Sequence, residues 1–180
     1  MNDFLPTDYK VPKGKSGYMK FQQGANRFRI MAKPILGFSI WTEVNGKPTP
    51  IRVRTEDEIN PDMITEQNRV NHFWAMPVWN YQDKLIQILE VTQKGLQKSL
   101  TALIQDEDWG DPTSYDIVVT KQGEKLETEY SLQPKPAKPV EPEIEAKFKE
   151  KYINLDALYD GEDPFKNNDL SVKPEGKKNE

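Results

Sequence analysis

The sequence predicts a mainly β protein, namely a small antiparallel barrel with one capping helix, followed by a flexible acidic C-terminal tail. Three observations predict this fold class. Five to seven short stretches alternate polar and apolar residues with the period of a strand. Only one segment before residue 134 has apolar residues at helical spacing, so the strand–helix alternation of a doubly wound sheet is absent. Beyond residue 134 the chain becomes rich in proline and charge.

Composition divides the chain into three parts. Hydrophobic residues make up 36% of the 180 residues, charged residues 30%, and the mean hydropathy is -0.81. A chain this polar cannot all be packed core. Prolines, glycines and lysines at residues 1–17 predict a flexible basic arm, and residues 18–135 hold the strand patterns of a folded core. Residues 136–180 are expected to be a proline-rich linker and an acidic tail.

The first strands of the core are predicted to display cations. Residues 26–33 alternate strictly, with Phe28 and Ile30 on one face and Arg27, Arg29 and Lys33 on the other. After Pro34, residues 35–43 resume the pattern, and Asn45-Gly46 predicts a tight hairpin turn. Residues 51–54 repeat the arrangement, with Arg52 and Arg54 directed outward.

The middle of the chain supplies the largest hydrophobic surface. Residues 70–92 contain two apolar runs separated by polar turn residues, the pattern of a hairpin. The first run contains several aromatic side chains, which belong either to the core or to an open face that stacks on a ligand. Residues 92–105 follow as a helix with a leucine stripe. Residues 115–121 and 128–133 form a final strand pair.

This order of elements favours the oligonucleotide/oligosaccharide-binding (OB) fold. It gives three strands, a hairpin, one helix and a final strand pair, and an OB barrel closes such strands around a core. Closure also removes the unpaired strand edges that an open sheet would expose.

The residues give no support for an enzyme, a metal site or a cofactor. The chain has no cysteine, so thiolate ligands and cysteine nucleophiles are excluded. The single histidine, His72, lies among aromatic residues in a predicted strand, and the acidic clusters at 56–58 and 106–108 have no supporting ligands. No apolar run approaches the ~18 residues of a membrane span, and the N-terminus does not resemble a signal peptide. We therefore expect a cytoplasmic protein without a membrane partner.

Charge and aromatic residues together predict binding to single-stranded nucleic acid. Residues 1–56 contain ten Lys or Arg and four Asp or Glu, whereas residues 57–180 are acidic. Single strands present a phosphate chain and unstacked bases, so a binder needs cations and rings along one groove. The candidate DNA-binding residues are Arg27, Arg29, Lys33, Trp41, Arg52, Arg54, Trp74 and Trp79.

Several segments also resemble a known family. The stretches YMKFQQGANRFRIM, PILGFSIW, HFWAMPVWNYQDKLIQILEVTQKGLQKSL, DWGDPTSYDIVVT and LETEYSLQPKP are similar to those of bacteriophage-encoded single-stranded DNA-binding proteins with an OB-fold core. The resemblance covers about residues 18–138 and, in character, the tail at 141–165. It implies a protein that coats single-stranded DNA, largely without sequence specificity, during phage replication and recombination in the host cytoplasm.

The resemblance also implies a role for the tail. In similar proteins an acidic C-terminal tail recruits replication proteins, such as a polymerase, helicase or primase, and screens the DNA-binding cleft. The corresponding residues here are Asp160, Glu162, Asp163, Pro164 and Phe165. Fifteen residues follow Phe165, which puts capture of a partner through the terminal carboxylate in doubt. Some relatives hold a structural zinc, which a chain without cysteine should lack.

Alternative functions remain open from the sequence. An RNA-binding OB module has the same requirements for cations and rings. A protein-interaction adaptor would use the rings as core and the tail as its docking element. A nuclease or nucleotide-processing enzyme is disfavoured because the chain offers no set of ligands or catalytic groups.

Overall fold

The computed structural model describes residues 16–167 and shows a mainly β protein, as the sequence predicts. Every pair of strands is antiparallel. The strands and helices are β1 (Gly24–Ile30), β2 (Ile35–Val44), β3 (Lys47–Val53), β4 (Asn71–Asn80), β5 (Leu85–Val91), α1 (Lys94–Gln105), β6 (Asp116–Gln122), β7 (Glu129–Pro134) and α2 (Pro142–Glu150). Five short 3-10 helices are also present among the described residues, at Glu56–Glu58, Pro61–Met63, Pro112–Ser114, Lys125–Glu127 and Leu155–Asp160.

The strand order matches an OB barrel with one long insertion. Hydrogen bonding connects the strands in the order β3-β2-β4-β1-β6-β7, and β5 pairs with the other edge of β4. The run β5-β4-β1-β6-β7, with α1 between β5 and β6 in the chain, is the arrangement expected of an OB barrel with its capping helix. The predicted fold class is thereby confirmed, and the insertion between β1 and β4 contains the β2–β3 hairpin.

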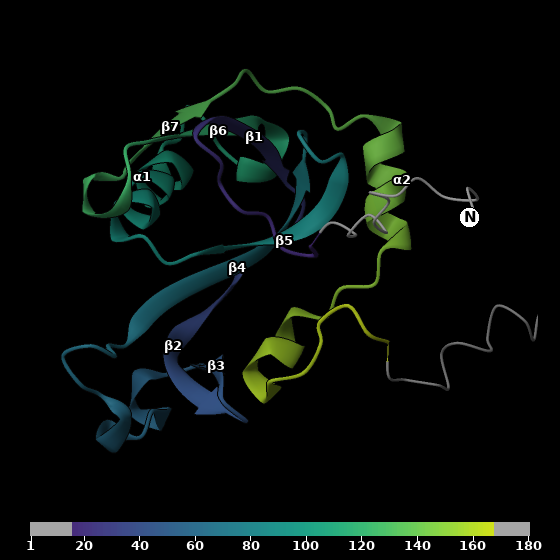
Figure 1. Cartoon of the computed structure of the whole chain (residues 1–180). Helices are drawn as coiled ribbons and strands as arrows, with labels where there is room; N and C mark the ends of the chain where they lie inside the picture. The colour runs from purple at the N-terminus through teal and green to yellow at the C-terminus, as the bar shows by residue number, and fades with distance from the viewer. Residues whose placement is uncertain (1–15, 168–180) are drawn as a thin grey trace, which may run out of the picture.

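The insertion forms an arm that leaves the barrel. The first half of β4, Asn71–Ala75, pairs with β2, whereas its last residues pair with β1. We call β2, β3 and this half of β4 the arm; it extends below the barrel in Figure 1. The β2–β3 turn has positive φ at both Asn45 and Gly46, the conformation of a primed hairpin turn.

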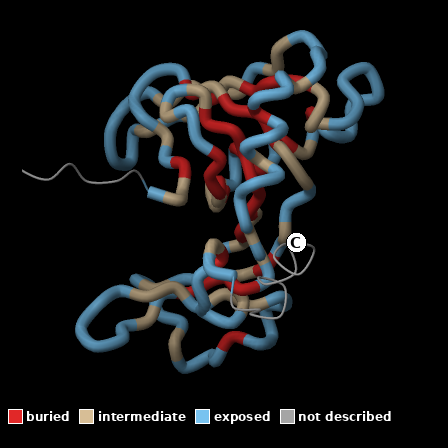
Figure 2. The backbone as a smooth tube through the Cα atoms, turned by 90° about the vertical axis from the view of Figure 1, so that its right-hand side faces the viewer, coloured by how far each residue is buried: buried red, intermediate tan, exposed pale blue. Residues whose placement is uncertain are grey.

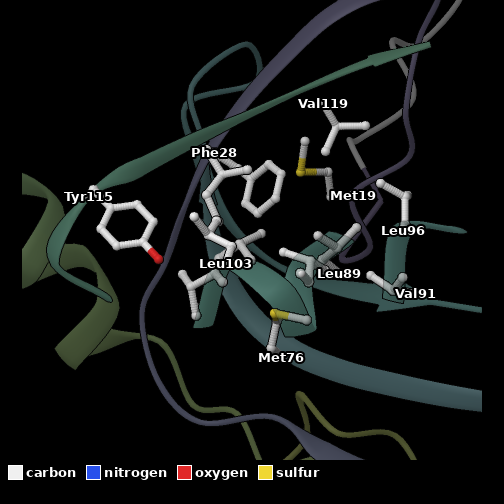
Figure 3. Packing of buried hydrophobic residues seen from close by; sticks show 13 residues of the cluster. Met19, Phe28, Met76, Leu89, Val91, Leu96, Leu103, Tyr115 and Val119 are labelled. Carbon is white, nitrogen blue, oxygen red and sulfur yellow. The ribbon is translucent and has the colours of Figure 1, made fainter. Parts of the chain in front are cut away.

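The main core lies inside the barrel and is closed by α1. Figure 3 shows Phe28, Met76, Leu89 and Leu103 converging from three strands and the helix. The helix contributes its stripe of Leu96, Leu100 and Leu103, which are all buried, as its spacing predicts.

The chain after β7 differs from the expected linker and tail. Residues 140–165, which we call the C-terminal segment, pack on the outer face of β4 and β5, the face opposite the main core. Ile144, Ala157 and Leu158 are buried in this contact, and Figure 2 shows buried positions continuing from the barrel to the junction with the arm. The boundary predicted at residue 135 is thus not the end of the packed structure. The reason is that Phe73, Ile86 and Ile88 make the outer face as apolar as the segment that covers it.

The flexible basic segment expected at residues 1–17 lies outside the described residues, apart from Ser16 and Gly17, and so does the tail after residue 167. Gly17 itself lies against Phe165, and a Cβ at this position would overlap the phenyl ring.

Candidate nucleic-acid interface

Arg27 and Arg29 lie at a polar cluster around Asp116 and do not form an open row of cations. The Asp116 carboxylate is fully buried and accepts hydrogen bonds from Arg27 Nη2 at 2.7 Å and from Arg29 Nη1 at 3.1 Å. Arg29 is only 1% exposed and also donates to the carbonyl groups of Thr113 and Lys138. The strand period predicted an outward Arg29, but the chain after β7 folds back over that face and buries it.

The environment of Asp116 fixes the charge of the cluster. Burial raises the pKa of Asp116, but hydrogen bonds from Arg27, Tyr81 and Arg29 outweigh burial and hold the pKa below its ordinary value. The Tyr81 hydroxyl donates to Asp116 Oδ1 at 2.9 Å. Burial, this hydrogen bond and the nearby carboxylate raise the pKa of Tyr81 to about 12. At neutral pH the cluster therefore contains an ionised Asp116, a neutral Tyr81 and the cations of Arg27, Arg29 and Lys138, whose Nζ lies 3.6 Å from Asp116 Oδ2. Its role is to hold β1, β6 and residue 138 together.

Arg52 and Arg54 lie on the outer face of the arm, where each has a partner. Arg52 forms a two-pronged ion pair with Glu90 of β5, with an Nε–Oε2 distance of 2.8 Å. The Arg54 guanidinium lies 4.0 Å from the ring centre of Tyr159, which belongs to the C-terminal segment. Both arginines therefore help to fix the outer face and its cover.

The tryptophans are distributed over both faces. Trp79 is buried on the outer face beneath α2, with Lys147 Nζ 5.4 Å from its ring centre. Trp41 is 51% exposed and lies near the far end of the arm. It is on the same face as Arg52, because Arg52 pairs with Ser39 and Trp41 is two residues further along β2. Trp74 lies on the opposite, inner face of β4 and is half-buried. Of the three candidate tryptophans, Trp74 thus lies on the opposite face of the sheet from Trp41 and Trp79.

Trp74 is the centre of an open groove between the arm and α1. It pairs with Leu36 of β2, and the next pair on the same face is His72 with Phe38. Two hollows border Trp74, which belongs to the lining of both. Both hollows are lined by residues of α1 and β4, two elements labelled in Figure 1.

The first hollow is deep and apolar, with a volume of about 390 Å³. Its lining comes from the bend between β1 and β2, from β4, from the second half of α1 and from the residues before β6. Lys33 and Asp111 are the charged residues of this lining. Hydrogen bonds from Thr113 and, to a smaller extent, the Lys33 ammonium hold the pKa of Asp111 below its ordinary value.

The second hollow is broader, about 600 Å³, and is bordered by cations. It lies between His72, Trp74 and the exposed side of α1, where Lys94 and Lys98 are four residues apart and point the same way. The His72 ring is fixed by a 2.8 Å hydrogen bond between Nδ1 and the carbonyl of Gly37 and by contact with Phe38 at 5.0 Å between ring centres. Among the described residues that line the two hollows, Asp111 is the single carboxylate and the lysines number three.

The sequence-predicted site is therefore only partly assembled. Of the eight candidate residues, the groove brings together Lys33 and Trp74. Lys94 and Lys98 were not predicted, because the leucine stripe assigns this helix to the core and says nothing of its exposed face. Their spacing of four on the polar face of an amphipathic helix is a signal that would have identified them.

The predicted partner-binding tail is partly buried against its own domain. Pro164 is buried, and the Phe165 ring contacts Tyr18 edge-on at 6.0 Å between ring centres. Asp163 accepts a hydrogen bond from the backbone N–H of Phe165 at 2.9 Å, which fixes the turn. Asp160 and Glu162 remain exposed.

Two structural features of residues 16–167 bear on the class of site. Within residues 16–167 no group of three or more carboxylate or histidine side chains is placed to hold a metal ion. The same part of the chain contains no helix long and apolar enough to cross a membrane.

Comparison with known proteins gives no relative. No family model, no curated protein and no solved structure matches this chain.

Proposed function

We propose that this chain is a non-enzymatic single-stranded DNA-binding protein, and that the strand lies in the groove beside Trp74. The observation that carries the proposal is a half-buried indole ring that borders two hollows, each of which is also lined by lysine. The OB-like topology supports the same class of function, since OB barrels commonly bind single strands.

The groove meets the two physical requirements of a single-strand binder. Lys33, Lys94 and Lys98 are exposed and can approach phosphates. The backbone of Trp74 is held by the pairing of β4 with β2 and its side chain packs against the main core, so the ring is positioned before a base arrives and loses little freedom on binding. A base stacked on such a ring contributes about 1–3 kcal/mol of binding free energy.

The arginines are less suited to the role. Arg27, Arg29 and Arg52 already have carboxylate partners, so a phosphate would have to displace Asp116 or Glu90. The lysines of the groove have no carboxylate within ion-pair distance among the described residues. The lysines of the groove can therefore meet a phosphate without displacing a carboxylate, whereas the cations around Asp116 are already paired with it.

The wider role follows from the resemblance of the sequence. The protein would coat single-stranded DNA during phage replication and recombination in the host cytoplasm. Its C-terminal residues would recruit replication proteins, and Asp160 and Glu162 are the exposed members of that set. Phe165 would become available to a partner only after leaving Tyr18.

The experiment is a salt titration of binding to a labelled oligo-dT. Lys94→Gln combined with Lys98→Gln removes two phosphate contacts, so affinity should fall and the slope of log K against log salt should decrease by about 1.4. Lys47→Gln with Lys149→Gln is the matched control, because it removes the same charge from exposed positions outside the groove. The control should retain the slope of the unmodified protein.

Further substrates distinguish the alternatives. Single-stranded DNA should bind more tightly than a duplex of the same length. Tighter binding to a matched RNA oligomer would favour the RNA-binding module. Absence of binding to any nucleic acid at low salt would contradict the proposal and leave the adaptor function.

A further inference from the structure

The deep hollow beside Trp74 has properties that the fold itself does not need. Its floor consists of core residues, namely Ile30, Met76 and Leu100. Its walls include Leu36, which is 50% exposed, and Ile104, which is 39% exposed. Both are large apolar side chains left in contact with water at the mouth of an apolar hollow, so a ligand that covers them gains hydrophobic stabilisation.

The polar groups of the hollow are confined to one side. Asp111 accepts hydrogen bonds from the backbone N–H and the hydroxyl of Thr113, both at 2.9 Å. Lys33 also lines the hollow, and its ammonium is close enough to Asp111 to lower the pKa of that carboxyl group. A ligand is thus offered an apolar wall, an aromatic wall and a polar side with one cation and one anion. This is the usual composition of a small-ligand site, and a volume of about 390 Å³ lies within the roughly 300–1,000 Å³ of such sites.

The surrounding charge selects among the ligands that fit. Lys33 lies at the hollow and Lys94 and Lys98 lie beyond Trp74, so the approach is cationic and suits a ligand attached to phosphates. A flat group that reaches the hollow along such a path is a nucleobase. Among the DNA bases, thymine carries a methyl group at C5, which an apolar wall can bury and which the other bases lack.

We propose that the deep hollow is a base pocket in which one unstacked base of the bound strand lies against Trp74, with a preference for thymine through contact of its methyl group with Leu36 and Ile104. The inference rests on the proposed single-strand binding and adds a subsite with base selectivity. Binding elsewhere along the groove remains insensitive to sequence, since phosphate contacts and stacking do not distinguish bases.

The test compares oligo-dT with oligo-deoxyuridine of equal length, about ten nucleotides, using fluorescence anisotropy. The two differ only in the C5 methyl group. Burial of one methyl group corresponds to roughly a fourfold difference in affinity, so the unmodified protein should bind oligo-dT about fourfold more tightly. Leu36→Ala with Ile104→Ala should bring the ratio close to one, because the affinity for oligo-dT should fall more than the affinity for oligo-deoxyuridine.

The control and the contrary outcomes distinguish a failure of the base pocket from a failure of the proposed single-strand binding. Leu126→Ala removes a fully exposed leucine from the β6–β7 turn and should leave the ratio at about four. Equal and tight binding of both oligomers by the unmodified protein would overturn the pocket while the proposed function stands. A ratio that persists in the Leu36 and Ile104 variant would place methyl recognition elsewhere and also overturn it. Failure of both oligomers to bind would overturn the proposed function and this inference together.

Discussion

Asp116 shows how one residue can decide the role of several others. It is fully buried and accepts hydrogen bonds from Arg27, Arg29 and Tyr81, so its charge organises two side chains of β1 and one from the loop after β4. Removal of the carboxylate would leave the Arg29 guanidinium buried without an anion. Loss of one member of a buried ion pair typically destabilises a protein by about 3–5 kcal/mol.

The first prediction is that Asp116→Ala lowers the free energy of unfolding by about 3–5 kcal/mol, measured by urea denaturation at neutral pH. Asp108→Ala, at an exposed position, is the control and should change stability by less than about 0.5 kcal/mol. A loss below about 1 kcal/mol for Asp116→Ala would mean that the cluster does not stabilise the fold.

The second prediction concerns alkaline pH and Tyr81. Its pKa is raised to about 12 in the folded protein, mainly by burial and by its contacts with Asp116. The neutral hydroxyl therefore stabilises the fold fully below pH of about 10, and this contribution is lost as pH rises toward 12. Between these values the unmodified protein should lose more stability than Tyr81→Phe. Parallel stability curves for the two proteins would contradict the assignment.

The third prediction concerns Tyr115, whose side chain is fully buried. Among the described residues its hydroxyl oxygen has no hydrogen-bond partner, and Figure 3 shows the hydroxyl directed toward the cluster of core residues. A buried hydroxyl without a partner costs stability, and phenylalanine keeps the ring and its contact with Trp109. Tyr115→Phe should leave the melting temperature unchanged or raise it. A clear decrease would show that the hydroxyl has a partner in solution.

At the scale of single residues, the sequence predicts which residues carry charges and rings, but it does not predict how they are paired. Alternation correctly placed Phe28 and Ile30 toward the core. It could not show that Arg29 meets Asp116, which lies 87 residues further along the chain. It also could not distinguish Trp74 from Trp79, since the choice between open and covered faces depends on where distant segments pack.

The elements themselves were largely predictable from local chemistry. The Asn45-Gly46 turn, the hairpin of β4 and β5, and the helix expected at 92–105 all occur, with α1 beginning at Lys94. Each has a local signal, such as a primed turn, alternation with period two, or a leucine stripe. The arm was not predicted, because the division of β4 between β1 and β2 follows from long-range pairing.

The C-terminal segment is the element for which the expectation changed most. Its composition is that of a solvated linker and tail, but Ile144, Phe148, Leu155 and Leu158 provide an apolar stripe. A stripe on a short charged segment does not reveal whether a complementary surface exists. The outer face of β4 and β5 supplies that surface here.

The fourth prediction is that truncation after Pro139 destabilises the protein. It would expose Trp79, Phe73 and Ile88, so the free energy of unfolding should fall and tryptophan emission should shift to longer wavelength. Because the contact is mainly apolar, the loss should persist at high salt, unlike that of a purely electrostatic tail. Truncation after Asn167 retains the contact and is the control. Unchanged stability after the longer deletion would mean that the segment is not needed for folding.

At the scale of the whole molecule, the two faces of the sheet differ in whether another segment covers them. The outer face of β4 and β5 is covered by the C-terminal segment, and its arginines have partners. The inner face of the arm remains open beside α1 and carries Trp74 with Lys33, Lys94 and Lys98. The net charge of the chain is -4, so the placement of its cations matters more for polyanion binding than their total. This arrangement makes the groove the surface on which a single strand should lie.

The most direct test of this claim is photocrosslinking of the full chain to oligo-dT that contains one 5-iodouracil, followed by mass spectrometry of the attached peptide. Aromatic residues in contact with the base are the expected sites of attachment. The account predicts crosslinks at Trp74, which fall strongly in the Lys94→Gln and Lys98→Gln variant. Crosslinks confined to Trp41 or to Tyr159, on the opposite face, would contradict it.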